Sequence, residues 1–209
     1  MKSPLIIYPD RCAVLPPQYM GSVAYYAVMA AYGRVIIDSS MRYDKRFKSA
    51  HRCEIASTHG LMKLTVPVSK DSLFGRGWNQ ARVSDHGDWW SDHVVSLESA
   101  YGRTPFFEYY FDRLRPWLSR PQGITVGELD AALDREIRAM LHLGTEVAYD
   151  MAQVPADAVD YRRCLPSAAI VPYYQVRADR LGFIPGLSIV DLIFNMGPEA
   201  PLILQQMSF

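Results

Sequence analysis

The largest group of side chains suited to chemistry lies in a basic segment between residues 42 and 52. Cations and an imidazole alternate there with aromatic rings. Guanidinium and ammonium groups this close together can neutralise a phosphate or a carboxylate. A solvated basic loop or an edge strand would have a similar composition, but its aromatic residues would then have little use. The ligand-binding residues predicted in this segment are Tyr43, Lys45, Arg46, His51 and Arg52.

Two other side chains have the chemistry of an acid or a base. Asp38 directly follows the apolar run 35–37, and α/β folds place working residues just beyond the carboxyl ends of their strands. Followed by two serines, Asp38 is equally typical of a turn cap. His93 lies near the start of an expected helix and can exchange a proton near neutral pH, whereas a lone helical histidine is more often structural. We predict His93 or Asp38 as the catalytic base.

The elements that must position these groups begin with a strand, a helix and a strand. Apolar runs at 4–8 and 35–37 predict buried strands. Helical spacing from Gln18 to Tyr32 predicts a helix between them, with Gly33 as its C-terminal cap. This order implies a right-handed crossover and a parallel pair. Further strands are expected at 61–68, 80–85 and 145–149.

The remainder of the chain is predicted to be mainly helical. The longest amphipathic stretch, 125–143, opens with the spacing of a capping box. A helix starting at Asp88 carries His93, Leu97 and Tyr101 on one face, and residues 153–161 are expected to form a polar loop. Other helical stretches are expected at 106–117, 187–194 and 199–207. Since there is no internal repeat or low-complexity linker, we predict one α/β domain over 1–209, with a mainly parallel sheet flanked by helices.

Composition narrows the classes of function. Lys plus Arg and Asp plus Glu both number 22, which argues against a nucleic-acid binder driven by bulk charge. No apolar run reaches the roughly 18 residues of a membrane span, and the N-terminal apolar run is too interrupted for a signal peptide. The three cysteines lack metal-ligand spacing, so a reducing cytoplasm is expected.

Several well-known motifs are absent from the sequence. There is no GxGxxG, no phosphate-binding loop ending in Gly-Lys-Ser/Thr, and no HExxH, CxxC or GxSxG. No cofactor and no metal are therefore predicted. Cys53 follows Arg52 and has the sequence context of a nucleophile with a lowered pKa, but a small buried hydrophobic residue is the more common role for such a cysteine.

Three groups of segments resemble the WbqC-like protein family. One begins with Leu-Pro-Pro-Gln-Tyr, another contains Tyr-Gly-Arg-Thr-Pro-Phe-Phe, and the last begins with Gly-Phe-Ile-Pro-Gly. They follow one another in the family's order over nearly the whole chain. Relatives usually have Asn-Arg where this chain has His51-Arg52, so the contact made by that asparagine is not carried over. The segments are 15–19, 43–55, 64–68, 90–93, 98–110 and 182–199.

The resemblance implies a role in making bacterial surface polysaccharides. The family is largely uncharacterised, and acylation or aminoacylation of an amino sugar has been suggested for it. The implied substrate is a small molecule, a nucleotide-linked amino sugar. Transfer to its amine needs a base, oxyanion donors and cations for phosphates. Gln18, Tyr19 and Tyr43 would then contact sugar hydroxyls, while Lys45, Arg46 and Arg52 would hold phosphates.

The sequence leaves two hypotheses of different classes open. A cytoplasmic transferase would bring His93, Asp38 and Arg52 together in one pocket. A non-catalytic binding or scaffold protein of a polysaccharide-assembly complex would instead present an exposed apolar patch, for which the aromatic segment 104–117 is the candidate.

Overall fold

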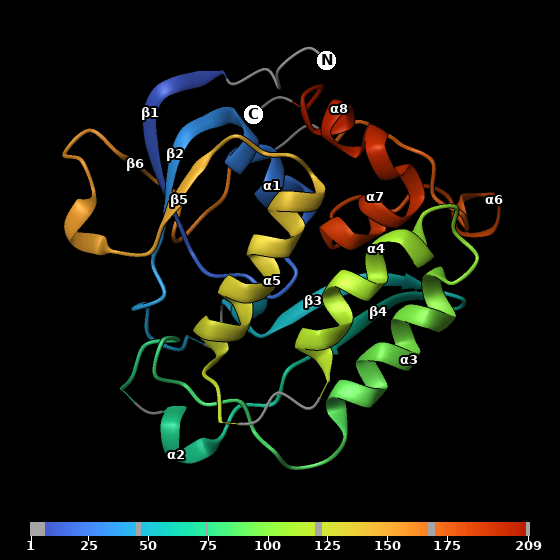
Figure 1. Ribbon diagram of the computed structural model, residues 1–209, viewed down its shortest axis with the longest axis horizontal. Helices are drawn as coiled ribbons and strands as arrows, with labels where there is room; N and C mark the ends of the chain where they lie inside the picture. The colour runs from blue at the N-terminus through green and yellow to red at the C-terminus, as the bar shows by residue number, and fades with distance from the viewer. Residues whose placement is uncertain (1–6, 45–46, 74, 120–122, 167–169, 208–209) are drawn as a thin grey trace.

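A four-stranded parallel sheet organises the computed structural model, which describes the chain except residues 1–6, 45–46, 74, 120–122, 167–169 and 208–209. Its strands are β1 (Tyr8–Leu15), β2 (Tyr32–Ile37), β5 (Glu146–Ala148) and β6 (Val159–Asp160). They lie in the order β5-β2-β1-β6 and every pair is parallel (Figure 1). The predicted fold class, an α/β protein with a mainly parallel sheet, is confirmed, and so is the parallel pairing of the first two strands.

The first strand differs from the prediction in its position. We expected it over 4–8, ended by Pro9 and Asp10, but both residues lie inside β1. The register with β2 shifts between Tyr8 and Cys12. This irregularity accommodates a proline that has no N–H for the ladder, and the described part of the strand continues to Leu15.

Gly33 was predicted to cap a helix, and that prediction is wrong. The helix α1 covers Val23–Ala31, and Gly33 already belongs to β2. A Cβ atom at this position would lie 1.8 Å from the carbonyl oxygen of Pro9. The glycine is therefore required by the close approach of two neighbouring strands.

The strand β6 falls where a polar loop was expected. It is only two residues long, pairs with β1, and the Tyr161 N–H extends the pairing with a 2.9 Å hydrogen bond to the Val14 carbonyl. Because β1 lies between β2 and β6, the chain leaves β1 toward one side and returns on the other. Parallel sheets bind ligands at such a switch point, beyond the carboxyl ends of the strands.

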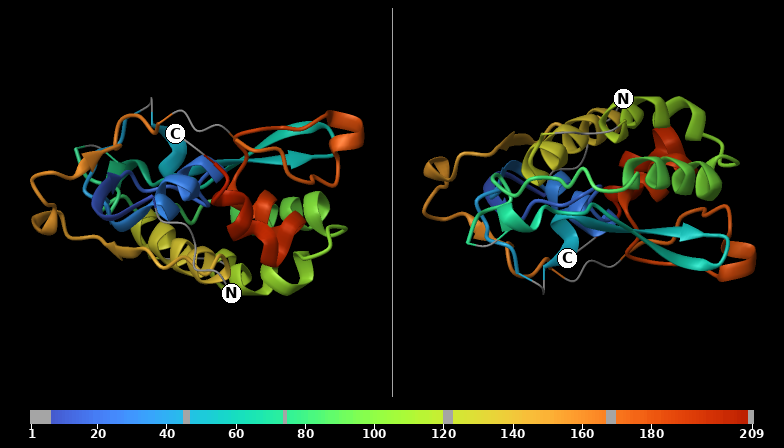
Figure 2. Two further views of the ribbon diagram at one scale, coloured as in Figure 1. Left: turned by 90° about the horizontal axis from the view of Figure 1, so that it is seen from above. Right: turned by 90° about the horizontal axis from the view of Figure 1, so that it is seen from below.

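A hairpin of β3 (Arg52–Ser57) and β4 (Gly60–Thr65) forms a separate antiparallel sheet. Thus the end of the basic segment is a strand, and the strand expected over 61–68 is β4, ending at Thr65. No strand forms over 80–85, where only isolated bridges join Arg82 to Thr125 and Val83 to Val68. Figure 2 shows the hairpin and the helix α5 (Val126–Met140) on opposite sides of the β1–α1–β2 unit.

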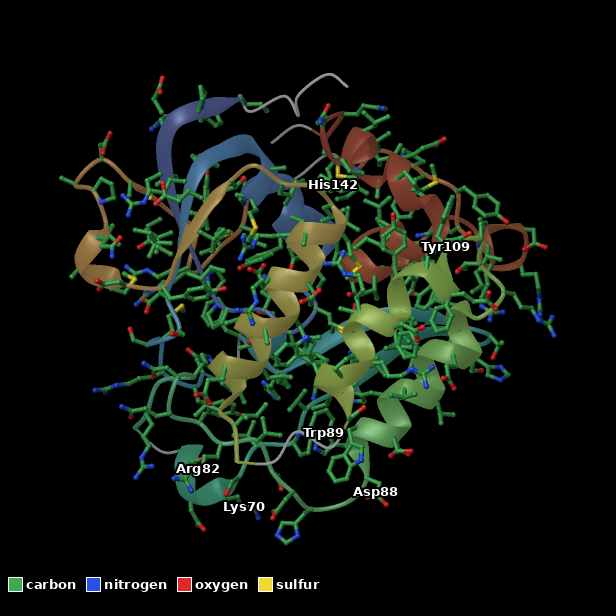
Figure 3. The ribbon with its side chains drawn as sticks, viewed as in Figure 1. Lys70, Arg82, Asp88, Trp89, Tyr109 and His142 are labelled. Atoms are coloured by element: carbon green, nitrogen blue, oxygen red, sulfur yellow. The ribbon has the colours of Figure 1, made fainter. Side chains whose placement is uncertain are left out.

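Most of the predicted helices are present. The predicted capping box of α5 forms between Thr125 and Glu128, and the predicted face of α3 (Trp89–Tyr101) is buried; Asp88 and Trp89 mark its start in Figure 3. The other α-helices are α2 (Lys70–Leu73), α4 (Phe107–Leu114), α6 (Ala178–Leu181), α7 (Ile189–Met196) and α8 (Ala200–Leu204), and the 3-10 turns are η1 (Lys48–Ala50), η2 (Arg115–Leu118), η3 (Met151–Gln153) and η4 (Gly197–Glu199). None of the described helices has both the length and the apolar composition needed to cross a bilayer.

The side of the core away from the parallel sheet is aromatic. Phe194 of α7 is fully buried, with its ring centroid 5.0 Å from that of Phe107 and 5.4 Å from that of Tyr101. Phe107 and Phe111 stack at 4.6 Å. This packing joins α3, α4 and α7, which lie together on the right of Figure 1, so these helices form a rigid support beside the sheet.

Candidate functional site

Hollows in the protein surface gather at the carboxyl edge of the parallel sheet. Their walls include residues that stand one to three positions after the carboxyl ends of β1, β2, β5 and β6. We call them the helix-end cavity, lined by Ser22 and Ser188, the ion-pair cavity, lined by Asp38 and Arg162, and the Asp130 cavity, lined by that residue of α5. The first two have volumes of about 270 and 430 Å³, near the lower end of the range for small-molecule sites.

The helix-end cavity brings together three parts of the chain that are far apart in sequence. The turn after β1, the segment from η1 into β3, and the turn before α7 form its wall. Ser22 and Ser188 cap the N-termini of α1 and α7 and both line it. The lining residues used below are Gln18, Tyr19, Ser22, Lys48, Arg52 and Ser188.

Hydrogen bonds between main-chain segments hold this wall together. The Tyr19 N–H donates to the Ser49 carbonyl at 2.9 Å, and the Ser188 hydroxyl donates to the Met20 carbonyl at 2.6 Å. Met20 has a φ of +42°, in the left-handed region that residues other than glycine seldom adopt. Such strain persists only where the surroundings impose it, and it is common at ligand sites.

The helix-end cavity has an excess of positive charge. Lys48 and Arg52 line it, and neither forms an ion pair with another described residue. Arg52 is oriented by a 2.9 Å bond from its Nε to the Thr65 hydroxyl. Among the described residues of the wall the single acid is Glu54, which pairs at 3.5 Å with Lys63 of β4. Together with the positive ends of two helices, this arrangement favours an anion.

The ion-pair cavity lies between the ends of β2 and β6. Its wall includes Asp38 and Tyr43 from the segment after β2, and Asp160 and Arg162 from β6 and the residues after it. Phe47 lines this cavity and the next residue, Lys48, lines the helix-end cavity. The two cavities are therefore neighbours, separated by one stretch of chain.

Asp38 is held by other parts of the protein. Its side chain is 4% exposed, accepts hydrogen bonds from the Ser40 N–H and hydroxyl, and pairs at 2.7 Å with Nη1 of Arg162. Arg162 also binds Asp160 at 2.7 Å, and the two carboxylates raise the pKa of its guanidinium. The turn-cap role foreseen for Asp38 is present, and it adds an ion pair across the sheet edge.

His51 supports the ion-pair cavity from behind. Its ring stacks on Trp78 at 5.3 Å and lies 6.1 Å from Tyr43, which lines the cavity. Burial, with help from the charges of Arg52 and Lys48, lowers the pKa of His51 to about 4. The imidazole is thus neutral at pH 7, and its ring packs against the aromatic residues that position Tyr43.

His93 lies in the core and not in the wall of either large cavity. Its Nδ1 is 2.8 Å from the hydroxyl of Tyr19, whose side chain is fully buried. Burial lowers the pKa of His93 to about 4, although a hydrogen bond with the Thr65 backbone acts in the opposite direction. Through Tyr19, this histidine anchors the turn after β1 to α3.

The buried His93 predicts a pH dependence of stability. The unfolded histidine takes up a proton below about pH 6.5, whereas the folded one does so near pH 4. Its contribution is therefore complete above pH 6.5 and is lost as the pH falls toward 4. Between pH 7.5 and 5.0 we expect the wild type to lose about 2 kcal/mol more than His93→Gln, measured by urea unfolding. Parallel pH profiles for the two proteins would contradict this expectation.

The structure distributes the sequence-predicted site residues over adjoining places. Gln18, Tyr19 and Arg52 line the helix-end cavity, and Asp38 and Tyr43 line the ion-pair cavity. Lys45 and Arg46 lie outside the described residues. The single shared pocket expected for His93, Asp38 and Arg52 is not found in the described part of the chain, since these residues lie in the core and in two separate cavities. The catalytic roles of His93 and Asp38 stay predictions.

Other residues of these walls were missed in the sequence. The sequence does not single out Arg162, because the strand before it, β6, is only two residues long and such a short apolar-polar pair is a weak signal for a strand. Ser188 stands directly before the apolar helix α7, which is an N-cap signal that was available. Its position beside Ser22 depends on tertiary structure alone.

Cys53 has the surroundings of a structural thiol. It is buried at the helix-end cavity, and burial, followed by the charge of Asp130, raises the pKa of its thiol. A nucleophilic cysteine needs the opposite shift. Among the described residues, no group of three or more His, Cys, Asp or Glu side chains is placed to hold a metal ion.

Comparisons with known proteins agree with the resemblance seen in the sequence. The model of the WbqC-like protein family matches residues 16–165, which is most of the chain and includes both large cavities except the turn at Gly186 and Ser188. A protein of Mycobacterium tuberculosis (strain ATCC 25618 / H37Rv) named "Uncharacterized protein Rv1507c" is 26% identical over 223 residues, covering 91% of this chain and 96% of the relative. No solved structure matches. The chain belongs to the WbqC-like protein family.

Proposed function

We propose that the protein transfers an acyl or aminoacyl group to the amine of a nucleotide-linked amino sugar in bacterial surface-polysaccharide biosynthesis. The observation that carries the proposal is the helix-end cavity, where Lys48 and Arg52 face a hollow at the carboxyl edge of a parallel sheet without an acidic partner among the described residues. A phosphate is the common anion for such a site.

The neighbouring cavities suggest how one ligand would lie. Its phosphates would occupy the helix-end cavity beside Arg52, Lys48 and Ser22, while its sugar would contact Gln18 and reach Tyr43 of the ion-pair cavity. Since Phe47 and Lys48 line different cavities and are consecutive residues, a sugar joined to a phosphate can span the boundary.

The reaction joins the amine nitrogen to the acyl carbon of the donor. The bond from that carbon to the donor's leaving group breaks, and the proton lost by the amine passes through a base to the leaving group. Holding the acyl donor next to the bound amine would make the attack intramolecular in effect, which is a large part of the rate advantage in such transfers.

Arg52→Ala tests the phosphate site. We expect the affinity for UDP-glucosamine, measured by isothermal titration calorimetry, to fall about 10- to 100-fold, because a charge-assisted hydrogen bond contributes about 1.5–3 kcal/mol. The melting temperature should change little, because this side chain is partly exposed and, among the described residues, its hydrogen bond is to the Thr65 hydroxyl. The exposed Arg103→Ala is the matched control.

Two results would contradict the proposal. The first is that the wild type binds no sugar nucleotide in a panel that varies base and sugar. The second is that Arg52→Ala binds UDP-glucosamine as tightly as the wild type does. A loss of several kcal/mol in unfolding free energy would instead make Arg52 a structural residue.

The scaffold alternative predicted an exposed apolar patch over 104–117. Tyr109 of α4, labelled in Figure 3, is 80% exposed. Phe107, Phe111 and Leu114 are buried against the core. The aromatic density of this segment is therefore mostly core packing, and the transferase remains the proposal that the site geometry supports better.

A further inference from the structure

Asp130 is a buried carboxylate without a partner. It lies in the second turn of α5 and is 4% exposed, yet neither carboxylate oxygen has a hydrogen-bond partner among the described residues. Other buried carboxylates are well supplied. Asp134 accepts bonds from Tyr26 and Arg138, and Asp191 accepts bonds from Tyr173 and Gln175. An unpaired buried carboxylate is costly, so Asp130 requires a separate explanation.

The carboxyl group lines a small cavity of about 10 Å³ at the same edge of the sheet. Its walls come from the ends of three parallel strands, through Gln18 after β1, Ser39 after β2 and Tyr149 after β5. Gln18 also lines the helix-end cavity, and Ser39 stands between Asp38 and Ser40 of the ion-pair cavity. The Asp130 cavity therefore adjoins both larger cavities and has room for one group the size of a water molecule.

The chemistry of the wall selects the kind of group that fits. Two carboxylate oxygens and the hydroxyls of Ser39 and Tyr149 can accept hydrogen bonds, so the complementary guest is a small donor with positive charge. An ammonium group has three donors and is compact. A divalent cation would need more oxygen ligands than one carboxyl group provides.

We propose that Asp130 and its cavity bind the primary ammonium group of the acceptor substrate. This inference rests on the proposed function, because it places the amine of the sugar beside the cavity that holds its phosphates. It also assigns the unpaired carboxylate a partner that the protein alone does not provide.

The electrostatics around Asp130 agree with this assignment. Burial raises the pKa of Asp130, and the charge of Asp134 one turn away adds to the effect. The other titratable groups near it are Tyr19 and Tyr25 on the β1–α1 segment, Cys53 on β3 and Tyr149 after β5, which are neutral at pH 7. Without an ammonium group beside it, the Asp130 carboxyl therefore keeps its proton to a higher pH than an ordinary aspartate does. An arriving ammonium group would release that proton.

The first test uses Asp130→Asn and simple ions. The pKa of Asp130 is higher in the folded protein than its unfolded value of about 3.9. The free energy of unfolding therefore falls as the pH rises above that unfolded value. The variant should therefore melt at a higher temperature than the wild type at pH 8, with the difference shrinking toward pH 4.

Ammonium chloride should raise the melting temperature of the wild type at pH 8 relative to tetramethylammonium chloride at equal ionic strength. The variant should not distinguish the two salts.

The second test compares UDP-glucosamine with UDP-N-acetylglucosamine. The wild type should bind UDP-glucosamine, which has the free amine, at least about tenfold more tightly than the acetylated sugar. A tenfold ratio corresponds to about 1.4 kcal/mol of binding free energy. Asp130→Asn should lose this preference and keep its affinity for the acetylated sugar, while the exposed Asp112→Asn should behave as the wild type.

The outcomes separate the two proposals. If neither nucleotide binds, the proposed function fails, and the ammonium result then decides the cavity alone. If both nucleotides bind equally to the wild type, or if ammonium has no specific effect on it, the ammonium site is overturned while the phosphate site stands.

Discussion

Arg162→Leu is expected to destabilise the protein by about 3 kcal/mol, because it leaves Asp38 as a buried charge without its cation. The Asp38 side chain is 4% exposed, and Arg162 Nη1 is 2.7 Å from its Oδ2. The remaining donors of Ser40 satisfy the other carboxylate oxygen only. Because a third of the Arg162 side chain is exposed (34%), water can replace part of the interaction. The expected loss is therefore at the lower end of the range for breaking a buried ion pair.

Urea unfolding at pH 7 measures this loss, and two further variants identify its cause. Arg163→Leu removes an exposed cation from the same cavity wall and should change stability little. Combining Arg162→Leu with Asp38→Asn removes the unpaired charge and should recover part of the loss. If Arg162→Leu is as stable as Arg163→Leu, the ion pair does not hold the sheet edge.

Gly33→Ala is expected to cost about 4 kcal/mol or more, enough to prevent folding at 37 °C. The added Cβ would lie 1.8 Å from the Pro9 carbonyl oxygen of the adjacent strand. The obstructing atom belongs to the backbone, so no rotamer change relieves the clash, and β1 and β2 must separate.

Gly144→Ala is the matched control for this prediction. Nothing lies within 4 Å of a Cβ at Gly144, and its φ is not in the left-handed region. We therefore expect it to unfold at nearly the wild-type urea concentration. Equal stability of the two alanine variants would show that β1 and β2 are not packed as closely as described.

Much of the fold could be predicted from local patterns. The capping box at Thr125 and Glu128, the buried face of α3 and the parallel pairing of β1 with β2 were all foreseen. These features follow from the 3.6-residue and two-residue periods of helices and strands and from the handedness of crossovers. The glycine at 33 failed as a cap because its role depends on a neighbouring strand.

The candidate site was only partly predictable. Arg52 was identified by residue type and Gln18 through the family resemblance, but their meeting at one cavity depends on the Tyr19 to Ser49 hydrogen bond. The strand β6 is too short for a periodic signal, so Arg162 was missed. Asp130 and Asp134 are four residues apart on the most clearly amphipathic helix, and that spacing was a signal for two acids on one face. It carried no indication that one of them would be buried without a partner.

The sequence by itself determined the family, the α/β class and most of the helices, because each depends on residue types at short spacing. Only the tertiary structure decided that His93 belongs to the core, that Asp38 pairs with Arg162 and that Asp130 stands alone. The physical reason is that burial and pairing are properties of segments far apart in the chain. The protonation state and the available hydrogen bonds of a side chain are set when those segments come together.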